Sequence, residues 1–235
     1  VAVVDWEGGA CDVVAVTKHR PVHWEVAPGA WNVVKDAWEF MTIISGHSEL
    51  TEDGGETWER RNRLSNAAAG HADAHTENAQ CGHETGHCVH NMARAAGAGE
   101  VLYQQNHHGV FRSPDGGRSW DDISGGLPST FGFPIAAHPR DPDTIWTLPL
   151  NGDMAGRYPP DAKAAVWRSR DGGQSWTDLR AGLPQAGCFF TVLRQAMAVD
   201  RLDPAGVAFG TNSGSVFFSA DEGDHWAEIA RHLPT

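Results

Sequence analysis

The chain has 235 residues, and its 30 acidic residues outnumber its 18 lysines and arginines, so the formal net charge of −12 argues against nucleic acid or an anionic membrane surface as a partner. Hydrophobic residues make up 40%, which is enough for the core of one domain, yet no apolar run reaches the length of a membrane span and no signal peptide is visible. The four cysteines are too few for a disulfide scaffold, which favours a cytoplasmic location for this chain that begins at Val1 rather than Met.

The first forty residues predict strands but carry no repeat. Val1–Val4 and Val13–Val16 are runs of β-favouring residues, and Gly8-Gly9 predicts a turn between them. We interpret residues 1–40 as an irregular segment or a closing unit of the repeat that begins at residue 41.

One eight-residue pattern then occurs four times. The copies are Thr51–Trp58, Ser113–Trp120, Ser169–Trp176 and, in weaker form, Ser219–Trp226. In each, an Asp can accept hydrogen bonds from the backbone ahead of it, and glycine supplies the positive φ of a tight hairpin. The closing Trp buries a large ring at the start of the next strand. We therefore expect hairpin tips whose structural residues are Asp53, Asp115, Asp171 and Asp221, with Trp58, Trp120, Trp176 and Trp226.

The spacing of this pattern predicts the architecture. The four Asp residues are 62, 56 and 50 residues apart along the chain. A period of this length with one hairpin per unit indicates a β-repeat, and a sheet of about four strands per unit is the blade of a propeller. We expect an all-β fold of four-stranded antiparallel blades, with about five blades in this chain or with the chain as part of a larger propeller.

These patterns resemble the Asp-box, or bacterial neuraminidase, repeats of sialidase-type β-propellers. Similar repeats occur in xyloglucan-degrading glycosidases, sortilin-like receptors and a photosystem assembly factor. The segments 86–90, 103–113 and 127–134 further resemble bacterial propellers labelled glycosyl hydrolase-like or exo-α-sialidase-like. The resemblance implies a single propeller domain over residues 1–235, with residues 1–40 as an irregular or closing blade and residues 41–235 as the Asp-box repeats.

Residues 65–90 are the least blade-like part of the repeat and are rich in histidine. His83-Glu84-Thr85-Gly86-His87 matches a pattern in which two His on one helical turn bind zinc and Glu activates water. The glycines around it and the alternation of the following residues favour a strand instead. Both interpretations stay open, with His83, His87 and His90 as ligands of a divalent metal such as zinc.

Polar side chains in the inner half of the later units are the candidates for a central site. Buried without partners they would be costly, so they are either hydrogen-bonded within the protein or directed at a ligand. The ligand-binding candidates are Gln104, Asn106, His107, His138 and Arg194.

Three functions compete. The first is a hydrolase-like propeller acting on a glycoside, for which Glu84 and Asp153 are the candidate carboxylates. The second is a non-catalytic propeller that binds a carbohydrate, small molecule or protein partner. The third is a metal-dependent hydrolase or oxidoreductase built on the histidine cluster. A true sialidase is disfavoured, because no arginine triad can be assigned and the chain has only two tyrosines.

Overall fold

The computed structural model describes residues 2–7, 10–17, 38–42, 48–51, 56–57, 59–60 and 89–234. The chain divides into two compact units. One comprises residues 1–89 with 117–120, and the other comprises residues 90–116 with 121–235. Among the described residues, no helix combines the length and apolar character that crossing a membrane would require.

The first unit contains a five-stranded sheet with the order β1-β2-β3-β4-β5. Its strands are β1 (Ala2–Glu7), β2 (Ala10–Thr17), β3 (Trp38–Thr42), β4 (Ser48–Thr51) and β5 (Glu59–Arg60). β2 and β3 run parallel, and the other neighbours are antiparallel. A parallel pair needs a crossover connection instead of a hairpin, so this sheet differs from an up-and-down blade. Asp53 and Trp58 lie outside the described residues, and the single propeller domain over residues 1–235 stays a prediction.

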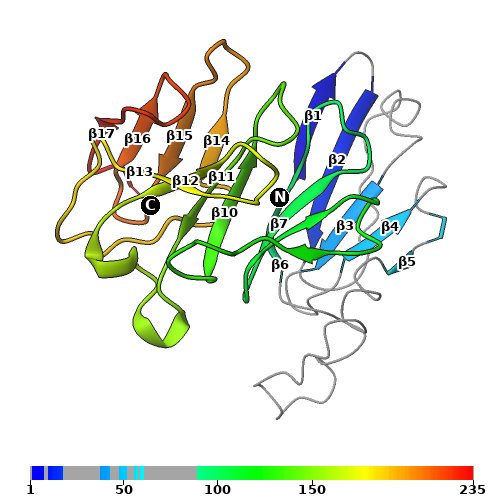
Figure 1. The fold of residues 1–235 in the computed structure, drawn as a ribbon, viewed down its shortest axis with the longest axis horizontal. Helices are drawn as coiled ribbons and strands as arrows, with labels where there is room; N and C mark the ends of the chain where they lie inside the picture. Colours follow the sequence, from blue (N-terminus) through cyan, green and yellow to red (C-terminus); the bar gives the residue numbers. More distant parts are fainter. Residues whose placement is uncertain are drawn as a thin grey trace. The chain divides into compact units, whose positions relative to one another are not determined.

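The second unit contains three four-stranded antiparallel sheets, and each follows the order of its strands in the sequence (Figure 1). The first blade comprises β6 (Val89–Arg94), β7 (Leu102–Asn106), β8 (Val110–Ser113) and β9 (Asp121–Asp122). The second comprises β10 (Gly132–Ala137), β11 (Ile145–Pro149), β12 (Val166–Ser169) and β13 (Thr177–Leu179). The third comprises β14 (Met197–Val199), β15 (Val207–Gly210), β16 (Val216–Ser219) and β17 (Ala227–Ala230). The predicted all-β fold with four-stranded antiparallel blades is confirmed.

The cores of these blades lie between neighbouring sheets. Trp146, Phe209 and Trp226 belong to one buried apolar cluster that spans the second and third blades. Tyr103 and Ile145 belong to another cluster, shared by the first and second blades. Because each sheet buries apolar side chains against the next, the blades support one another instead of folding as isolated sheets.

The third Asp box shows why the pattern makes a hairpin tip. The Asp171 carboxylate accepts bonds from the Ser175 N–H at 2.9 Å, the Ser175 hydroxyl at 2.6 Å and the Ser169 hydroxyl at 2.7 Å. The Gly173 N–H in turn donates to the Ser169 hydroxyl at 2.8 Å. These bonds, first of all that from the Ser175 hydroxyl, lower the pKa of Asp171 to about 2. The fourth box repeats the arrangement around Asp221, as predicted from the repeat.

The third and fourth boxes also join the second and third blades to the blade before them. The Trp176 indole N–H of the third box donates to the carbonyl of Ile123, which follows the first blade, at 2.8 Å. A Cβ at Gly173 would lie 2.4 Å from Ile123 Cδ1, so the glycine lets the box approach this side chain closely. In the fourth box, a Cβ at Gly223 would lie 2.5 Å from Leu179 Cδ1 of the second blade. The Asp box is therefore both a turn and a blade-to-blade contact.

Candidate functional site

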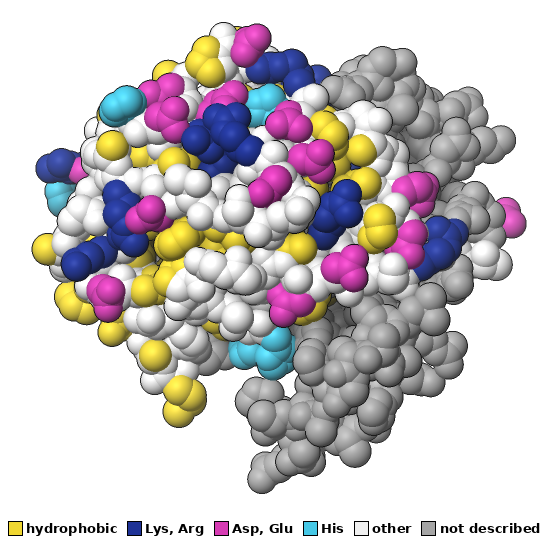
Figure 2. Space-filling model, viewed as in Figure 1, with side chains coloured by type: hydrophobic (Ala, Val, Ile, Leu, Met, Phe, Trp, Pro, Cys, Tyr) yellow, Lys and Arg dark blue, Asp and Glu magenta, His cyan; other side chains and the backbone are white. Residues whose placement is uncertain are grey.

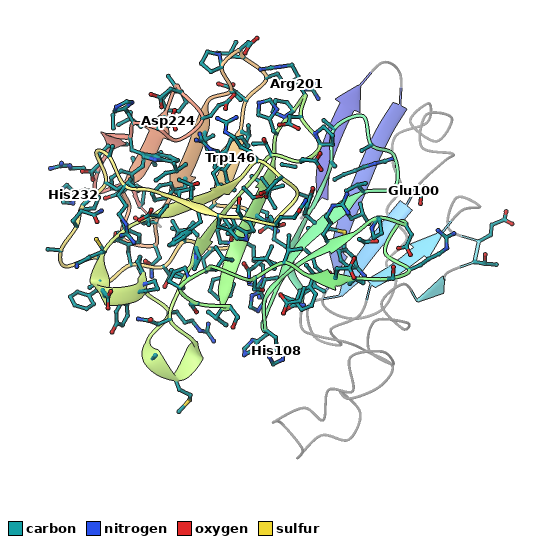
Figure 3. The ribbon with its side chains drawn as sticks, in the orientation of Figure 1. Glu100, His108, Trp146, Arg201, Asp224 and His232 are labelled. Carbon is teal, nitrogen blue, oxygen red and sulfur yellow. The ribbon has the colours of Figure 1, made fainter. Side chains whose placement is uncertain are left out.

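The two ends of the blades carry different groups of candidate residues. We call the end where β6, β10 and β14 begin the loop end, and the end that carries the Asp boxes the box end. In Figure 3, His108, which follows β7, and Arg201, which follows β14, lie at opposite ends of the sheets. β10 separates the ends by about 20 Å, at roughly 3.3 Å for each of its residues. Since Phe131 precedes β10 and His138 follows it, these two residues lie at different ends.

A cluster of four rings occupies the loop end. His90, on β6, has its ring centroid 4.7 Å from that of Phe133 and 5.4 Å from that of Phe131. His107, in the β7–β8 loop, lies 5.6 Å from His90 and 5.1 Å from Phe131. His90 is buried, and its Nδ1 lies 2.6 Å from the carbonyl oxygen of Gly132. A carbonyl only accepts, so Nδ1 carries the proton in this contact.

Two guanidinium groups face the same ring of this cluster. The Cζ atoms of Arg157 and Arg194 lie 5.8 Å and 5.3 Å from the centroid of Phe133. Both distances are within the range of a cation–π contact. Asn91 fixes the chain at Arg194 by donating to its carbonyl at 2.9 Å. The Nε of Arg194 is buried and has no hydrogen-bond partner among the described residues.

A pair of aromatic rings, one half-buried and one exposed, lies close to these arginines along the chain. Tyr158 and Phe189 have ring centroids 5.1 Å apart, and Phe189 is 72% exposed. The hydroxyl of Thr191 donates to the carbonyl of Arg157 at 2.9 Å, which ties the two loops together. In Figure 2, hydrophobic side chains and histidine lie along the lower edge of the described surface. Neither ring is among the site residues predicted from the sequence, because that prediction rests on polar side chains.

The polar residues of β7 mainly hold the loop in place. The Asn106 Oδ1 accepts from the N–H groups of His108 and Gly109 at 2.8 and 2.9 Å, which closes the β7–β8 turn. Gln105, which is not among the predicted site residues, donates from Nε2 to the carbonyls of Asn106, Gly109 and Thr130. Asn106 Nδ2 and Gln104 Oε1 are buried without hydrogen-bond partners among the described residues. Asn106 therefore has a structural bond at one atom and an unused donor at the other.

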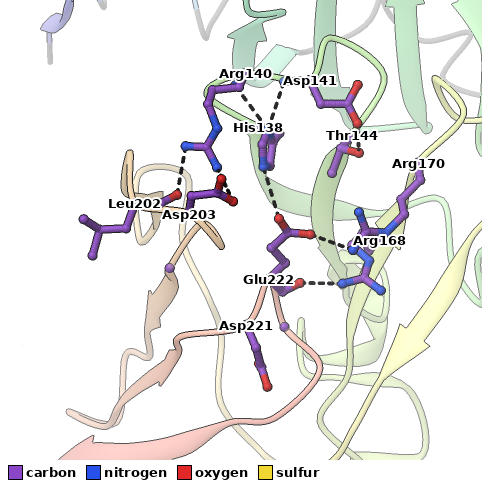
Figure 4. A network of polar contacts seen from close by, with 12 residues as sticks. His138, Arg140, Asp141, Thr144, Arg168, Arg170, Leu202, Asp203, Asp221 and Glu222 are labelled. Carbon is purple, nitrogen blue, oxygen red and sulfur yellow. Dashed lines mark hydrogen bonds and ion pairs between the residues drawn. The ribbon is translucent and has the colours of Figure 1, made fainter.

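The structure does not bring His138 together with Asn106, His107 and Arg194. At the box end, His138 Nδ1 accepts from the backbone N–H groups of Arg140 and Asp141 at 3.1 and 2.9 Å (Figure 4). Its Nε2 therefore carries the proton and faces Glu222 Oε1 at 3.3 Å. His138 belongs to a contact between the second and third blades, away from the ring cluster.

Glu222 is the centre of that contact and replaces the first glycine of the Asp box. Its other carboxylate oxygen accepts from Arg170 at 2.6 Å, and its backbone carbonyl accepts from Trp146 and Arg168, both at 2.9 Å. Its φ is +60°, close to the +69° of Gly172 in the third box. Burial opposes ionisation of Glu222, but the hydrogen bonds and charges of Arg170 and then His138 hold its pKa below the usual value. In the sequence, Glu222 is marked by the departure of the fourth box from the Asp-Gly-Gly of the other three.

The remaining predicted site residues are not tested by the structure. His83, Glu84 and His87 lie outside the described residues. Asp153 begins the short helix η1 (Asp153–Ala155), and its side chain is likewise outside the description. Within the described part of the chain, no group of three or more His, Cys, Asp or Glu residues is arranged to hold a metal ion.

Comparison with known proteins supports the fold. The crystal structure of an ancestral GH74 enzyme matches with a TM-score of 0.55 and 18% identity, over 79% of this chain and 21% of that one. The GH74 enzyme of Niastella koreensis matches with a TM-score of 0.47 and 16% identity, over 78% of this chain and 21% of that one. YCF48 from Cyanidioschyzon merolae matches with a TM-score of 0.46 and 18% identity, over 80% of this chain and 50% of that one. The chain thus spans about a fifth of the GH74 enzymes, and its three described blades have the fold of part of a β-propeller.

Comparison with models of protein families matches a smaller part of the chain. The model of the EutQ-like cupin domain matches residues 17–62. This match includes the first Asp-box sequence and lies within the unit that holds the parallel strand pair β2–β3. No curated protein matches the chain.

Proposed function

We propose that the loop end of the blades binds a carbohydrate. The observation that carries this proposal is the exposed ring of Phe189, which packs against the half-buried ring of Tyr158 and is joined through Thr191 to the loop of Arg157. A sugar ring presents C–H groups on its faces and hydroxyls at its edge. Aromatic side chains cover such faces, while guanidinium groups offer several donors in a fixed fork to the hydroxyls. Exposed aromatic surface of this kind commonly marks a binding site.

Binding is better supported than hydrolysis by the described residues. Cleavage of a glycosidic bond generally uses two carboxyl groups on either side of the scissile bond. The residues that form the ring cluster, together with its two arginines, supply no carboxyl group for this role. Glu84 and Asp153 therefore remain the proposed catalytic pair, and hydrolysis requires that their carboxyl groups lie on either side of the scissile bond. A protein ligand is the competing outcome, because the same ring pair could bind an apolar side chain.

Isothermal titration of the 235-residue chain with xyloglucan fragments and with carboxylate-bearing oligosaccharides tests the proposal. We expect binding to at least one probe, and Phe189→Ala should weaken it about tenfold because it removes an exposed ring worth roughly 1.5 kcal/mol in the complex. Leu202→Ala is the matched control, since Leu202 is 68% exposed and lies at the box end. Equal affinities of the two variants, or no binding to any probe, would contradict the proposal.

The same samples test the two enzymatic alternatives. Release of reducing ends would support hydrolysis, and its loss in Glu84→Gln or Asp153→Asn would support the proposed carboxylates. Inhibition by a chelator, together with stoichiometric zinc in the purified protein, would favour the metal-dependent alternative that uses His83, His87 and His90.

A further inference from the structure

An asparagine–glycine pair lies in the loop between β11 and β12, directly before the helix η1. Asn151-Gly152 is the single Asn–Gly dipeptide of the sequence. Both residues are half-buried, so solvent reaches them. Because glycine has no Cβ, its backbone nitrogen can approach the side-chain carbonyl of the residue before it with little steric hindrance. The pair is therefore a candidate for a reaction between neighbouring residues.

The hydrogen bonds around this pair leave its reacting groups free. The Asn151 N–H donates to the carbonyl of Tyr158 at 2.8 Å, and the Gly152 carbonyl accepts from the Ala155 N–H at 2.8 Å. Among the residues that the structure describes, neither the Asn151 side chain nor the Gly152 N–H has a hydrogen-bond partner. A Cβ at Gly152 would have no atom within 4 Å, so no neighbour crowds the glycine on that side. The nitrogen and the side-chain carbonyl are both available to react.

The Asp–Gly pairs of the second and third boxes lack this freedom. The Gly116 N–H donates to the carbonyl of Glu100 at 2.8 Å, and the Gly172 N–H donates to the carbonyl of Asp143 at 2.9 Å. The Asp171 carboxylate also accepts bonds from two hydroxyls and a backbone N–H. A nitrogen that donates a hydrogen bond must give it up before it can attack, so the fold protects these pairs.

A second asparagine provides an internal reference. Asn212 is exposed, but its Oδ1 accepts from the Thr191 N–H at 2.7 Å. The residue after it, Ser213, carries a Cβ, unlike Gly152. Exposure alone would favour reaction at Asn212, whereas the freedom of the reacting groups favours Asn151.

We propose that Asn151 is a site of spontaneous deamidation. The Gly152 backbone nitrogen attacks Asn151 Cγ and loses its proton to solvent. The new bond joins this nitrogen to Cγ, the bond from Cγ to Nδ2 breaks, and ammonia leaves with a proton taken from solvent. Water then opens the cyclic imide at either carbonyl to give aspartate or isoaspartate, and nothing is oxidised or reduced. The product places a carboxylate, and in the isoaspartate an extra backbone methylene, beside the bond from Asn151 to Tyr158.

Incubation of the whole 235-residue chain in mildly alkaline buffer, followed by peptide mass spectrometry that distinguishes aspartate from isoaspartate, tests this proposal. We expect the products to accumulate at position 151 at least about tenfold faster than at position 212. Guanidinium chloride, which unfolds the chain, should change the rate at Asn151 by less than about tenfold, because the fold does not protect this pair. Isomerisation of Asp171 should instead rise by more than about tenfold on unfolding.

Gly152→Ala is the test variant, and Gly125→Ala is the matched control. At both glycines a Cβ would have no atom within 4 Å, and neither φ lies in the left-handed region, so both variants should fold, as circular dichroism and thermal melting would check. Gly152→Ala should slow deamidation at Asn151 about tenfold, because the new methyl group hinders the attack, and Gly125→Ala should leave the rate unchanged.

Three results would overturn the proposal. The first is a rate at Asn151 in the folded chain that does not exceed the rate at Asn212. The second is a folded rate more than about tenfold below the unfolded one, since the fold would then protect Asn151 as well. The third is a rate that is unchanged in folded Gly152→Ala.

Discussion

Replacing Glu222 by alanine and by glycine separates two opposing contributions to the contact between the second and third blades. The carboxylate favours the folded state through Arg170 at 2.6 Å and His138 at 3.3 Å. The backbone opposes it, because a residue with a Cβ is held at φ +60°. Alanine removes the carboxylate and keeps the backbone cost, whereas glycine removes both.

The structure gives the size of each contribution. The Arg170 side chain is 52% exposed, so its ion pair is worth at most about 1 kcal/mol, and the His138 bond adds about 1 kcal/mol. The left-handed backbone costs about 1 kcal/mol or slightly more. Glu222→Ala should therefore lower the free energy of unfolding by about 1 to 2 kcal/mol, and Glu222→Gly by about 0 to 1 kcal/mol. The bonds that Trp146 and Arg168 donate to the backbone carbonyl are present in both variants.

Urea unfolding at neutral pH measures the difference, with unchanged m-values as the check that both variants unfold the same structure. The pKa of Glu222 is lowered on folding, so its contribution is present above about pH 4.5 and is lost as the pH falls through the folded pKa. The deficit of Glu222→Ala should shrink accordingly in acid. Equal stabilities of the alanine and glycine variants would refute the backbone argument, and a deficit that does not change with pH would refute the carboxylate argument.

Two further predictions concern the boxes and the close approach of the blades. Asp171→Ala should lower the free energy of unfolding by about 2 kcal/mol in urea titrations while leaving any loop-end ligand affinity unchanged. Since the pKa of Asp171 is about 2 in the folded chain, its wild-type contribution should disappear between about pH 4 and pH 2. Gly182→Ala should cost at least about 3 kcal/mol in thermal or urea unfolding, because its Cβ would meet the Trp226 carbonyl oxygen. Gly126→Ala, with similar φ and open space around it, should cost only about 1 kcal/mol, and equal effects would contradict this reading of the blade contact.

The box hairpins could be predicted from sequence because their chemistry is local. Ser169, Asp171 and Ser175 lie within seven residues of one another and satisfy their hydrogen bonds among themselves. The repeat then gives the number of strands per unit, since one hairpin and its flanking runs recur at each period. The parallel pairing of β2 with β3 could not be predicted in this way, because it joins strands that no box connects.

The grouping of site residues was harder to predict because it depends on strand direction. His138 and Phe131 are separated by the six residues of β10, so one follows the strand and the other precedes it. Both are near a strand end in the sequence, but the ends are opposite. Phe189 was overlooked for another reason, since an exposed ring resembles a core residue in the sequence until its burial is known.

The separation of the two ends also limits what each can do. The box end holds neighbouring blades together through Glu222 and the box glycines, while the loop end carries the ring cluster and the Tyr158–Phe189 pair. Because β10 places these groups about 20 Å apart, substitutions at one end should combine additively with substitutions at the other. The fourth box illustrates the consequence: exchanging its first glycine for Glu222 alters a blade contact without touching Tyr158 or Phe189. Blade packing and the proposed carbohydrate binding can therefore change independently in this chain, which makes the weaker box a feature of blade packing and not of the proposed site.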